Sequence, residues 1–109
     1  MDAYDLIISV MALNPNYNYE IEPSKILDNY PNEVLQDVGI RPHPIHGDSQ
    51  TLDNALNDLL KNRVLKLWSP GQSYSWDFPH TPLEYFKDKI KPKLSKEKIS
   101  KLEEFANSL

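Results

Sequence analysis

The stretch from Ser49 to Phe78 constrains the fold of this chain most, because it shows the helix period and the strand period one after the other. In its first half, apolar residues recur with the spacing that places them on one face of a helix, and polar residues fill the other face. Ser49 or Asp48 precedes this run and is suited to cap the amino end of the helix. The apolar residues are Leu52, Ala55, Leu56, Leu59 and Leu60.

The expected helix is followed directly by a segment whose apolar period is two, which is typical of strands. Alternation runs through residues 65–68 and again through residues 73–78, and the turn-forming residues Ser69-Pro70-Gly71-Gln72 lie between them. We therefore expect a helix that leads straight into a β-hairpin. One side of its second strand is aromatic, formed by Tyr74, Trp76 and Phe78.

The residues before this unit predict three more helices and one short strand. Asp2 and Asp5 have capping-box spacing and begin a helix with one apolar face. Residues 17–21 alternate and are expected to form a short strand. Pro23 fits the first turn of a second helix, and Asn32 can cap a third. The residues expected to be buried are Ala3, Leu6, Ile7, Val10, Met11, Ile26, Leu27, Tyr30, Val34, Leu35 and Val38.

The loop before the central helix and the segment after the hairpin are both shaped by prolines. Residues 40–47 are expected to form a rigid loop, because prolines at 42 and 44 force extended geometry on the residues before them. Thr81-Pro82-Leu83-Glu84 combines a capping box with proline at the first helical position, which predicts a helix from Pro82 to about Lys91. This helix should bury Leu83, Phe86 and Ile90, and a last helix capped by Ser95 should carry Ile99, Leu102, Phe105 and Ala106 on one face.

Length and composition fit one compact domain. The 109 residues, of which 39% are hydrophobic, can bury a core without covalent cross-links. The chain has no cysteine, which excludes a disulfide framework and a thiolate metal site. The apolar run near the amino terminus spans about eight residues, whereas a membrane span needs about 20. We therefore expect a cytoplasmic protein that makes no contact with a membrane.

The charge of the chain is unevenly distributed. Residues 1–81 hold five Lys and Arg against eleven Asp and Glu, whereas residues 82–109 hold seven Lys against five acidic residues. An acidic body repels a phosphate backbone except where its cations are locally arranged otherwise. The lysine run from Lys87 to Lys101 is interpreted first as a solvated face and second as an arm that contacts phosphates.

The order of the expected elements is helix, short strand, two helices, strand, turn, strand and helix. With Val64 continuing the leucine stripe of the central helix into the hairpin, and residues 69–72 as the tip, this order resembles the winged-helix domains of bacterial transcriptional regulators. The resemblance covers residues 1–91. It leaves residues 92–109 as an added helix that either packs on the domain or mediates a homodimer. It implies an α+β fold that is mainly α, with a small antiparallel sheet of three strands.

The resemblance also implies that the hydrophilic face of the helix over residues 51–63 enters the major groove of double-stranded DNA. Groove readout favours Arg, Lys, Asn and Gln, but Asp53 and Asp58 on the same helix repel phosphates. Two other interpretations therefore stay open: the face is only solvated, or it binds a protein as part of an acidic adaptor or inhibitor, with Trp68 as an anchor. The candidate DNA- or partner-binding residues are Gln50, Asn54, Asn57, Lys61, Asn62, Arg63, Lys66, Trp68 and Gln72.

Catalytic and metal-binding patterns are weak in this sequence. It contains no cysteine and no Gly-x-Ser-x-Gly motif, and its three glycines form no phosphate-binding loop. His43, His46 and Asp48 have a spacing that can bring two imidazoles and a carboxylate to a metal, but the two histidines are better interpreted as ordinary loop residues. We expect a non-enzymatic protein without a metal or cofactor.

Overall fold

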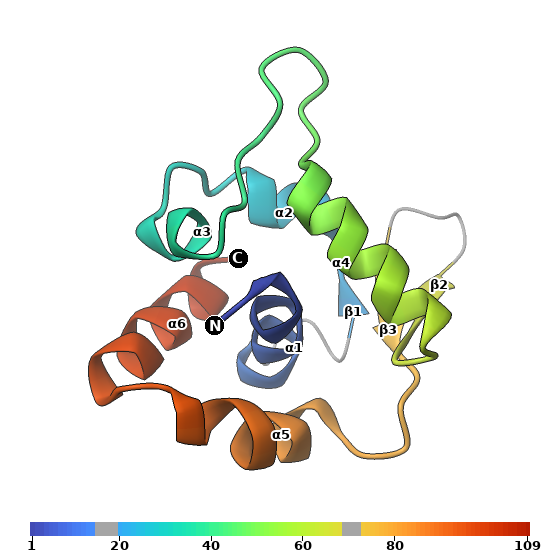
Figure 1. Cartoon of the computed structure of the whole chain (residues 1–109), viewed down its shortest axis with the longest axis vertical. Coiled ribbons are helices and arrows are strands. Elements are labelled where there is room, and N and C mark those ends of the chain that lie inside the picture. Colours follow the sequence, from blue (N-terminus) through green and yellow to red (C-terminus); the bar gives the residue numbers. More distant parts are fainter. Residues whose placement is uncertain (15–19, 69–72) are drawn as a thin grey trace.

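The computed structural model describes residues 1–14, 20–68 and 73–109, except for the side chain of Trp68. Within these residues the chain forms six α-helices and one antiparallel sheet of three strands (Figure 1), so the expected α+β, mainly α class is confirmed. The elements are α1 (Ala3–Leu13), β1 (Glu20–Ile21), α2 (Pro23–Leu27), α3 (Glu33–Asp37), α4 (Gln50–Lys61), β2 (Leu65–Trp68), β3 (Ser73–Trp76), α5 (Pro82–Tyr85), the π-helical η1 (Phe86–Ile90), the 3-10 turn η2 (Lys91–Lys93) and α6 (Lys96–Ser108).

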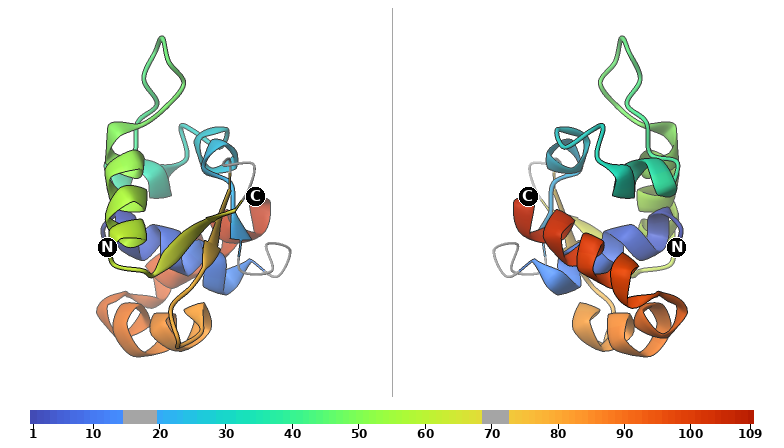
Figure 2. Two further views of the ribbon diagram at one scale, coloured as in Figure 1. Left: turned by 90° about the vertical axis from the view of Figure 1, so that its right-hand side faces the viewer. Right: turned by 90° about the vertical axis from the view of Figure 1, so that its left-hand side faces the viewer.

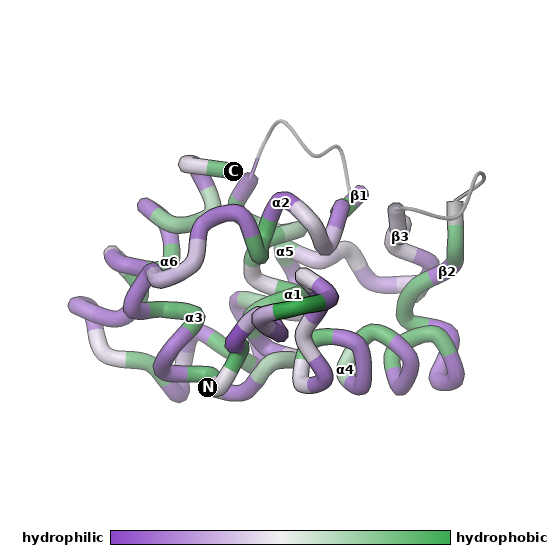
Figure 3. Tube along the Cα trace, turned by 90° about the horizontal axis from the view of Figure 1, so that it is seen from above, coloured by the Kyte–Doolittle hydropathy of each residue, from purple (hydrophilic) through white to green (hydrophobic). Residues whose placement is uncertain are grey.

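Helix α1 lies at the centre of the molecule, with α4 on one side of it and α5 and α6 on the other (Figure 1). Every residue from Leu6 to Met11 is buried, including Ile8 and Ser9, which the sequence pattern does not place on the apolar face. The burial extends around the whole helix because the carboxy-terminal helices cover the side that α4 leaves open. Figure 3 shows α1 as a mostly hydrophobic segment among helices that alternate in hydropathy.

Helix α4 begins where the sequence predicts, since the Ser49 hydroxyl accepts a hydrogen bond from the Leu52 amide at 3.4 Å. It buries the predicted leucine stripe against α1 and leads into β2. The sheet has the order β1-β3-β2. Ile21 lies opposite Tyr74, and Leu65 lies opposite Trp76, so apolar side chains share the inner face of the sheet. Of the expected first strand, residues 17–19 lie outside the described residues, as does the turn at 69–72.

The aromatic side of β3 packs against the start of the carboxy-terminal segment. Trp76, Phe78 and Tyr85 meet edge to face, with ring centroids 6.3–6.5 Å apart. This arrangement supports the interpretation of these rings as packing residues rather than as a binding surface. The predicted helix over 82–91 is α-helical only to Tyr85 and continues as a π-helical segment and a 3-10 turn. The second change of pitch, from π to 3-10 at Lys91, lies next to Pro92, which has no amide hydrogen to donate.

Two of the residues expected to be buried are exposed. Tyr30 is 40% exposed because α2 ends at Leu27, three residues before it. Leu83 is 39% exposed, and Pro82 is the buried residue of that first helical turn instead. The expectation for Phe86 and Ile90 is confirmed, since both are buried against α1.

The last helix, α6, folds back onto the rest of the chain, and its Leu102, Phe105 and Ala106 are fully enclosed. The side-chain amide of Asn14 donates a hydrogen bond to the carbonyl of Ala106, which joins the ends of α1 and α6. The basic carboxy-terminal segment also pairs with the acidic body. The Lys93 ammonium lies 3.2 Å from Asp5, and the Lys101 ammonium lies 3.0 Å from Glu33. Two of the seven lysines in residues 82–109 therefore form ion pairs with the rest of the chain.

Candidate functional site

The exposed face of α4 carries a row of polar side chains without a carboxylate at its centre. Gln50, Asn54, Asn57 and Lys61 are all exposed and recur at intervals of three and four residues, which aligns them along one side of the helix. The row spans roughly 16 Å at 1.5 Å per residue. The Gln50 amide donates to the Asn54 side-chain oxygen at 2.8 Å, so these two amides are joined to each other along the helix surface. We call these four residues the α4 stripe.

The two acidic residues of α4 lie on the flanks of this stripe, and both are partly buried. Asp58 accepts a hydrogen bond from the hydroxyl of Tyr4 on α1, which holds the carboxylate toward the body of the protein. That hydrogen bond, with smaller contributions from burial and from nearby carboxylates, raises the pKa of Tyr4. On the other flank, burial and then the charge of Asp48 raise the pKa of Asp53. The repulsion of phosphates that the sequence predicts from Asp53 and Asp58 therefore acts at the edges of the α4 stripe.

The carboxy-terminal end of α4 holds an arginine in an unusual backbone conformation. Arg63 has a φ of 58°, which is the left-handed region that favours glycine. Its amide donates to the carbonyl of Leu60, and the amide of Val64 donates to the carbonyl of Leu59, which together form a Schellman cap. Asn62 has an ordinary φ of −85°, and its side-chain amide donates to the Asp58 carbonyl at 2.9 Å. The exposed guanidinium of Arg63 thus sits where glycine would suit the backbone better.

Replacing Arg63 by glycine is expected to stabilise the fold by about 1 kcal/mol, because the left-handed backbone costs an L-residue about that much. The adjacent substitution Asn62→Gly is the matched control and should destabilise, since its backbone gains nothing from glycine and a helix-capping amide is lost. Urea unfolding of the two variants and the unmodified chain measures the difference. Equal destabilisation of both variants contradicts the described cap.

The hairpin continues the surface beyond the end of α4. Lys66 is exposed on the face of the sheet that also holds Ser75, its neighbour on β3. Leu67 is 54% exposed, although Leu65 on the same side of the strand is buried, so apolar surface reaches solvent toward the end of β2. The candidates Trp68 and Gln72 cannot be placed, because the Trp68 side chain and the whole of Gln72 lie outside the described residues.

The loop over residues 41–48 projects from the amino-terminal end of α4 (Figures 1 and 2) and is braced by contacts within itself. The ring of His43 stacks on that of His46, with centroids 4.6 Å apart. Its Nδ1 accepts hydrogen bonds from the amides of Ile45 and His46 at 3.1 and 3.3 Å. The backbone of His43 also bonds to Asp48 and Gly47 across the base of the loop. The expected irregular loop is found, and at its tip Ile45 is 83% exposed.

The two histidine rings of this loop stack on each other, and His43 also accepts hydrogen bonds from the backbone. In the described part of the chain, no group of three or more His, Asp or Glu is arranged to hold a metal.

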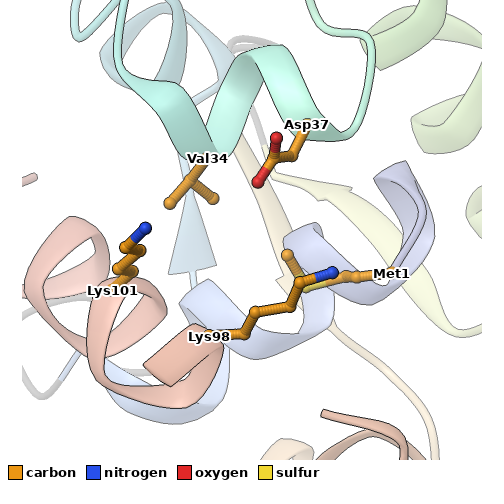
Figure 4. A pocket seen from close by; sticks show the side chains of 5 residues that line it. All are labelled: Met1, Val34, Asp37, Lys98 and Lys101. Atoms are coloured by element: carbon orange, nitrogen blue, oxygen red, sulfur yellow. The ribbon is translucent and has the colours of Figure 1, made fainter. Parts of the chain in front are cut away.

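A separate hollow of about 290 Å³ lies between α3, α6 and Met1 (Figure 4). Val34, Asp37, Lys98 and Lys101 line it, and Lys101 is already paired with Glu33 and Glu97. The hollow therefore presents balanced charge and belongs to none of the surfaces around α4.

Compared with known protein families, curated proteins and solved structures, the chain matches none of them. In the ranges that the structure covers, no helix has both the length and the apolar character that crossing a bilayer requires.

The helical spacing in the sequence identified the residues of the α4 stripe, but it gave no sign of two side chains that shape the surface around it. Tyr4 restrains Asp58 from a position 54 residues away, and no local pattern signals that pairing. Ile45 follows a proline in a loop that was expected to be rigid, but its exposure depends on how far the loop stands off the body. A helical wheel of α4 does place Asp53 and Asp58 beside the stripe rather than on it, so that part of the signal was present in the sequence.

Proposed function

We propose that this chain is a small, non-enzymatic, cytoplasmic DNA-binding regulatory protein of the winged-helix type, with the α4 stripe in the major groove. The observation that carries the proposal is the composition of that stripe. Its three amides, from Gln50, Asn54 and Asn57, are groups that base edges recognise, and the helix's carboxylates lie to either side. The Lys61 ammonium at the end of the stripe would contact a phosphate. Arg63 and Lys66 extend the cationic surface past the end of the helix, where phosphates would lie.

The arrangement of elements supports the winged-helix part of the proposal. A first helix, a short strand, a set of helices ending in α4 and a hairpin follow one another, and the first strand pairs with the last to give the order β1-β3-β2. Helix α3 and the loop over 41–48 lengthen the connection between α2 and α4 beyond a minimal turn. Homodimerisation through α6, if part of the function, must use the outward side of that helix, because its apolar stripe is enclosed.

The alternative function is an acidic protein-binding adaptor or inhibitor that uses the same helix face and the hairpin. It is favoured by the net charge of −4 and by the 54% exposure of Leu67, since apolar side chains contribute to the core of a protein interface and not to contacts with phosphates. Mixed amides and flanking carboxylates raise no electrostatic penalty at such an interface.

Salt titration of DNA binding tests the proposal. We expect fluorescence anisotropy of a labelled pool of random duplexes to report binding whose log affinity falls with log salt at a slope of about −3, if Lys61, Arg63 and Lys66 each contact a phosphate. Lys61→Ala should weaken binding and reduce the slope by about one. Lys96→Ala, which removes an exposed lysine at the start of α6, is the matched control. Absence of duplex binding by the unmodified chain at low salt refutes the proposal and leaves the adaptor function.

A further inference from the structure

The tip of the loop over residues 41–48 holds the most exposed large apolar side chain among the described residues. Ile45 is 83% exposed, whereas the next, Leu67, is 54% exposed. Burying an isoleucine is worth about 1.5–3 kcal/mol, so a chain that leaves one in water forgoes a substantial contribution to stability. The residues that flank the loop on each side, Ile40 and Ser49, are fully buried and therefore anchor its two ends.

Contacts within the loop fix the conformation that exposes Ile45. Two prolines fix its backbone, and Gly47 adopts a φ of 68°, which lets the chain turn back toward α4. The Nδ1 atom of His43 accepts two amide hydrogen bonds from the tip, and the stacked His46 ring covers one side of His43. The tip is therefore ordered before any partner arrives, and little conformational entropy is lost when it is engaged.

We propose that Ile45 is an apolar wedge that enters the minor groove of DNA next to the major-groove segment read by α4. The proposal rests on the DNA-binding function proposed above and extends it to a second contact. Apolar side chains that enter the minor groove partly unstack a base step and bend the duplex. The protein would then read its site both by base contacts along the α4 stripe and by the ease with which the flanking step is deformed.

Continuity with the α4 stripe is the first reason to assign DNA as the occupant. The loop leads directly into Gln50, the first residue of the stripe, and it projects at the opposite end of α4 from the hairpin (Figure 1). The stripe spans roughly 16 Å. Major and minor grooves alternate along one side of a duplex at about half of its 34–36 Å repeat. The proposal therefore places the tip, which extends past the amino end of α4, in the neighbouring minor groove when the stripe occupies the major groove.

The second reason is the size and charge of the tip. Protein interfaces of ordinary size bury about 800 Å² on each partner, whereas Ile45 stands alone between Pro44 and His46 on a narrow loop. The loop carries Arg41 and two histidines against the single carboxylate of Asp48, so it lacks the acidic excess of the rest of residues 1–81. A narrow, uncharged wedge on a non-acidic loop fits a groove between phosphate backbones better than it fits a flat protein surface.

The test uses the full chain and a duplex selected from a random pool by the unmodified protein. We expect Ile45→Ser to lower affinity for that duplex by about tenfold or more, as the loss of one buried isoleucine predicts. It should also reduce the bend measured by energy transfer between dyes at the duplex ends. Ile45→Leu should keep most of both properties. Leu83→Ser, which makes the same kind of change at an exposed leucine of α5, is the control.

The outcomes separate this inference from the proposed function. If Ile45→Ser binds and bends the selected duplex as the unmodified chain does, the wedge is overturned, DNA binding stands, and the tip is left to a protein partner. If the unmodified chain selects no duplex, both proposals fall together. Because Ile45 is almost fully exposed, its replacement should leave the urea midpoint unchanged, so a lost affinity cannot be assigned to unfolding.

Discussion

Replacing Phe105 by alanine is expected to lower the free energy of unfolding by about 3–5 kcal/mol, the cost usual for truncating an enclosed phenylalanine. The side chain is 1% exposed and belongs to the stripe of α6 that covers α1. A domain of this size has a total stability of about 5–15 kcal/mol, so this single change removes a large part of it. Urea unfolding followed by far-UV circular dichroism measures the loss.

Asn107→Ala is the control for this prediction, because Asn107 lies on the exposed side of the same helix. Its effect should stay within about 0.5 kcal/mol. A Phe105→Ala variant whose free energy of unfolding lies within about 1 kcal/mol of that of the unmodified chain would behave nearly like a surface variant. That result would mean that α6 does not pack on α1 as described.

Placing two carboxylates on the α4 stripe, by Asn54→Asp together with Asn57→Asp, is expected to reduce DNA affinity on the order of a hundredfold. Like charges brought together at an interface cost several kcal/mol, and here the new charges would face both base edges and phosphates. The two substitutions keep side-chain size, so the fold should be little affected. Fluorescence anisotropy at fixed low salt measures the loss.

The same chemical change at Asn107 on α6 is the control, since Asn107→Asp adds one exposed carboxylate away from the stripe. We expect it to bind DNA nearly as well as the unmodified chain. If the double variant also binds normally, α4 does not face DNA, and the surface is left for a protein partner.

The local elements of this fold were predictable because each is specified by residues close together in sequence. The change of apolar period after Arg63, the cap at Ser49 and the proline at 82 each predicted an element that the structure contains. The winged-helix resemblance, rather than period alone, predicted that the first strand pairs with the hairpin, and the structure shows that its partner is β3. The exposure of Leu83 was not predicted, because one residue of a capping box cannot show which side of a short turn faces the core.

The polar residues of the candidate site were predicted, but the contacts that position the residues around them were not. Asn54, Asn57 and Lys61 follow from helical spacing, but the restraint of Asp58 by Tyr4 joins positions that only the packing of α1 against α4 brings together. The pairing of Lys93 with Asp5 and of Lys101 with Glu33 likewise crosses most of the chain. The unequal charge of residues 1–81 and 82–109 indicated that the two segments attract each other, but it did not show which lysines would form ion pairs.

The enclosure of the middle of α1, from Leu6 to Met11, has a consequence for how the molecule moves. The amide hydrogens of this covered stretch exchange with solvent only when the whole domain opens, whereas elements at the periphery open locally. The loop over 41–48 is held mainly by bonds within itself. Contacts made by its tip are therefore separate from the packing of α1, so recognition and global stability can change independently of each other.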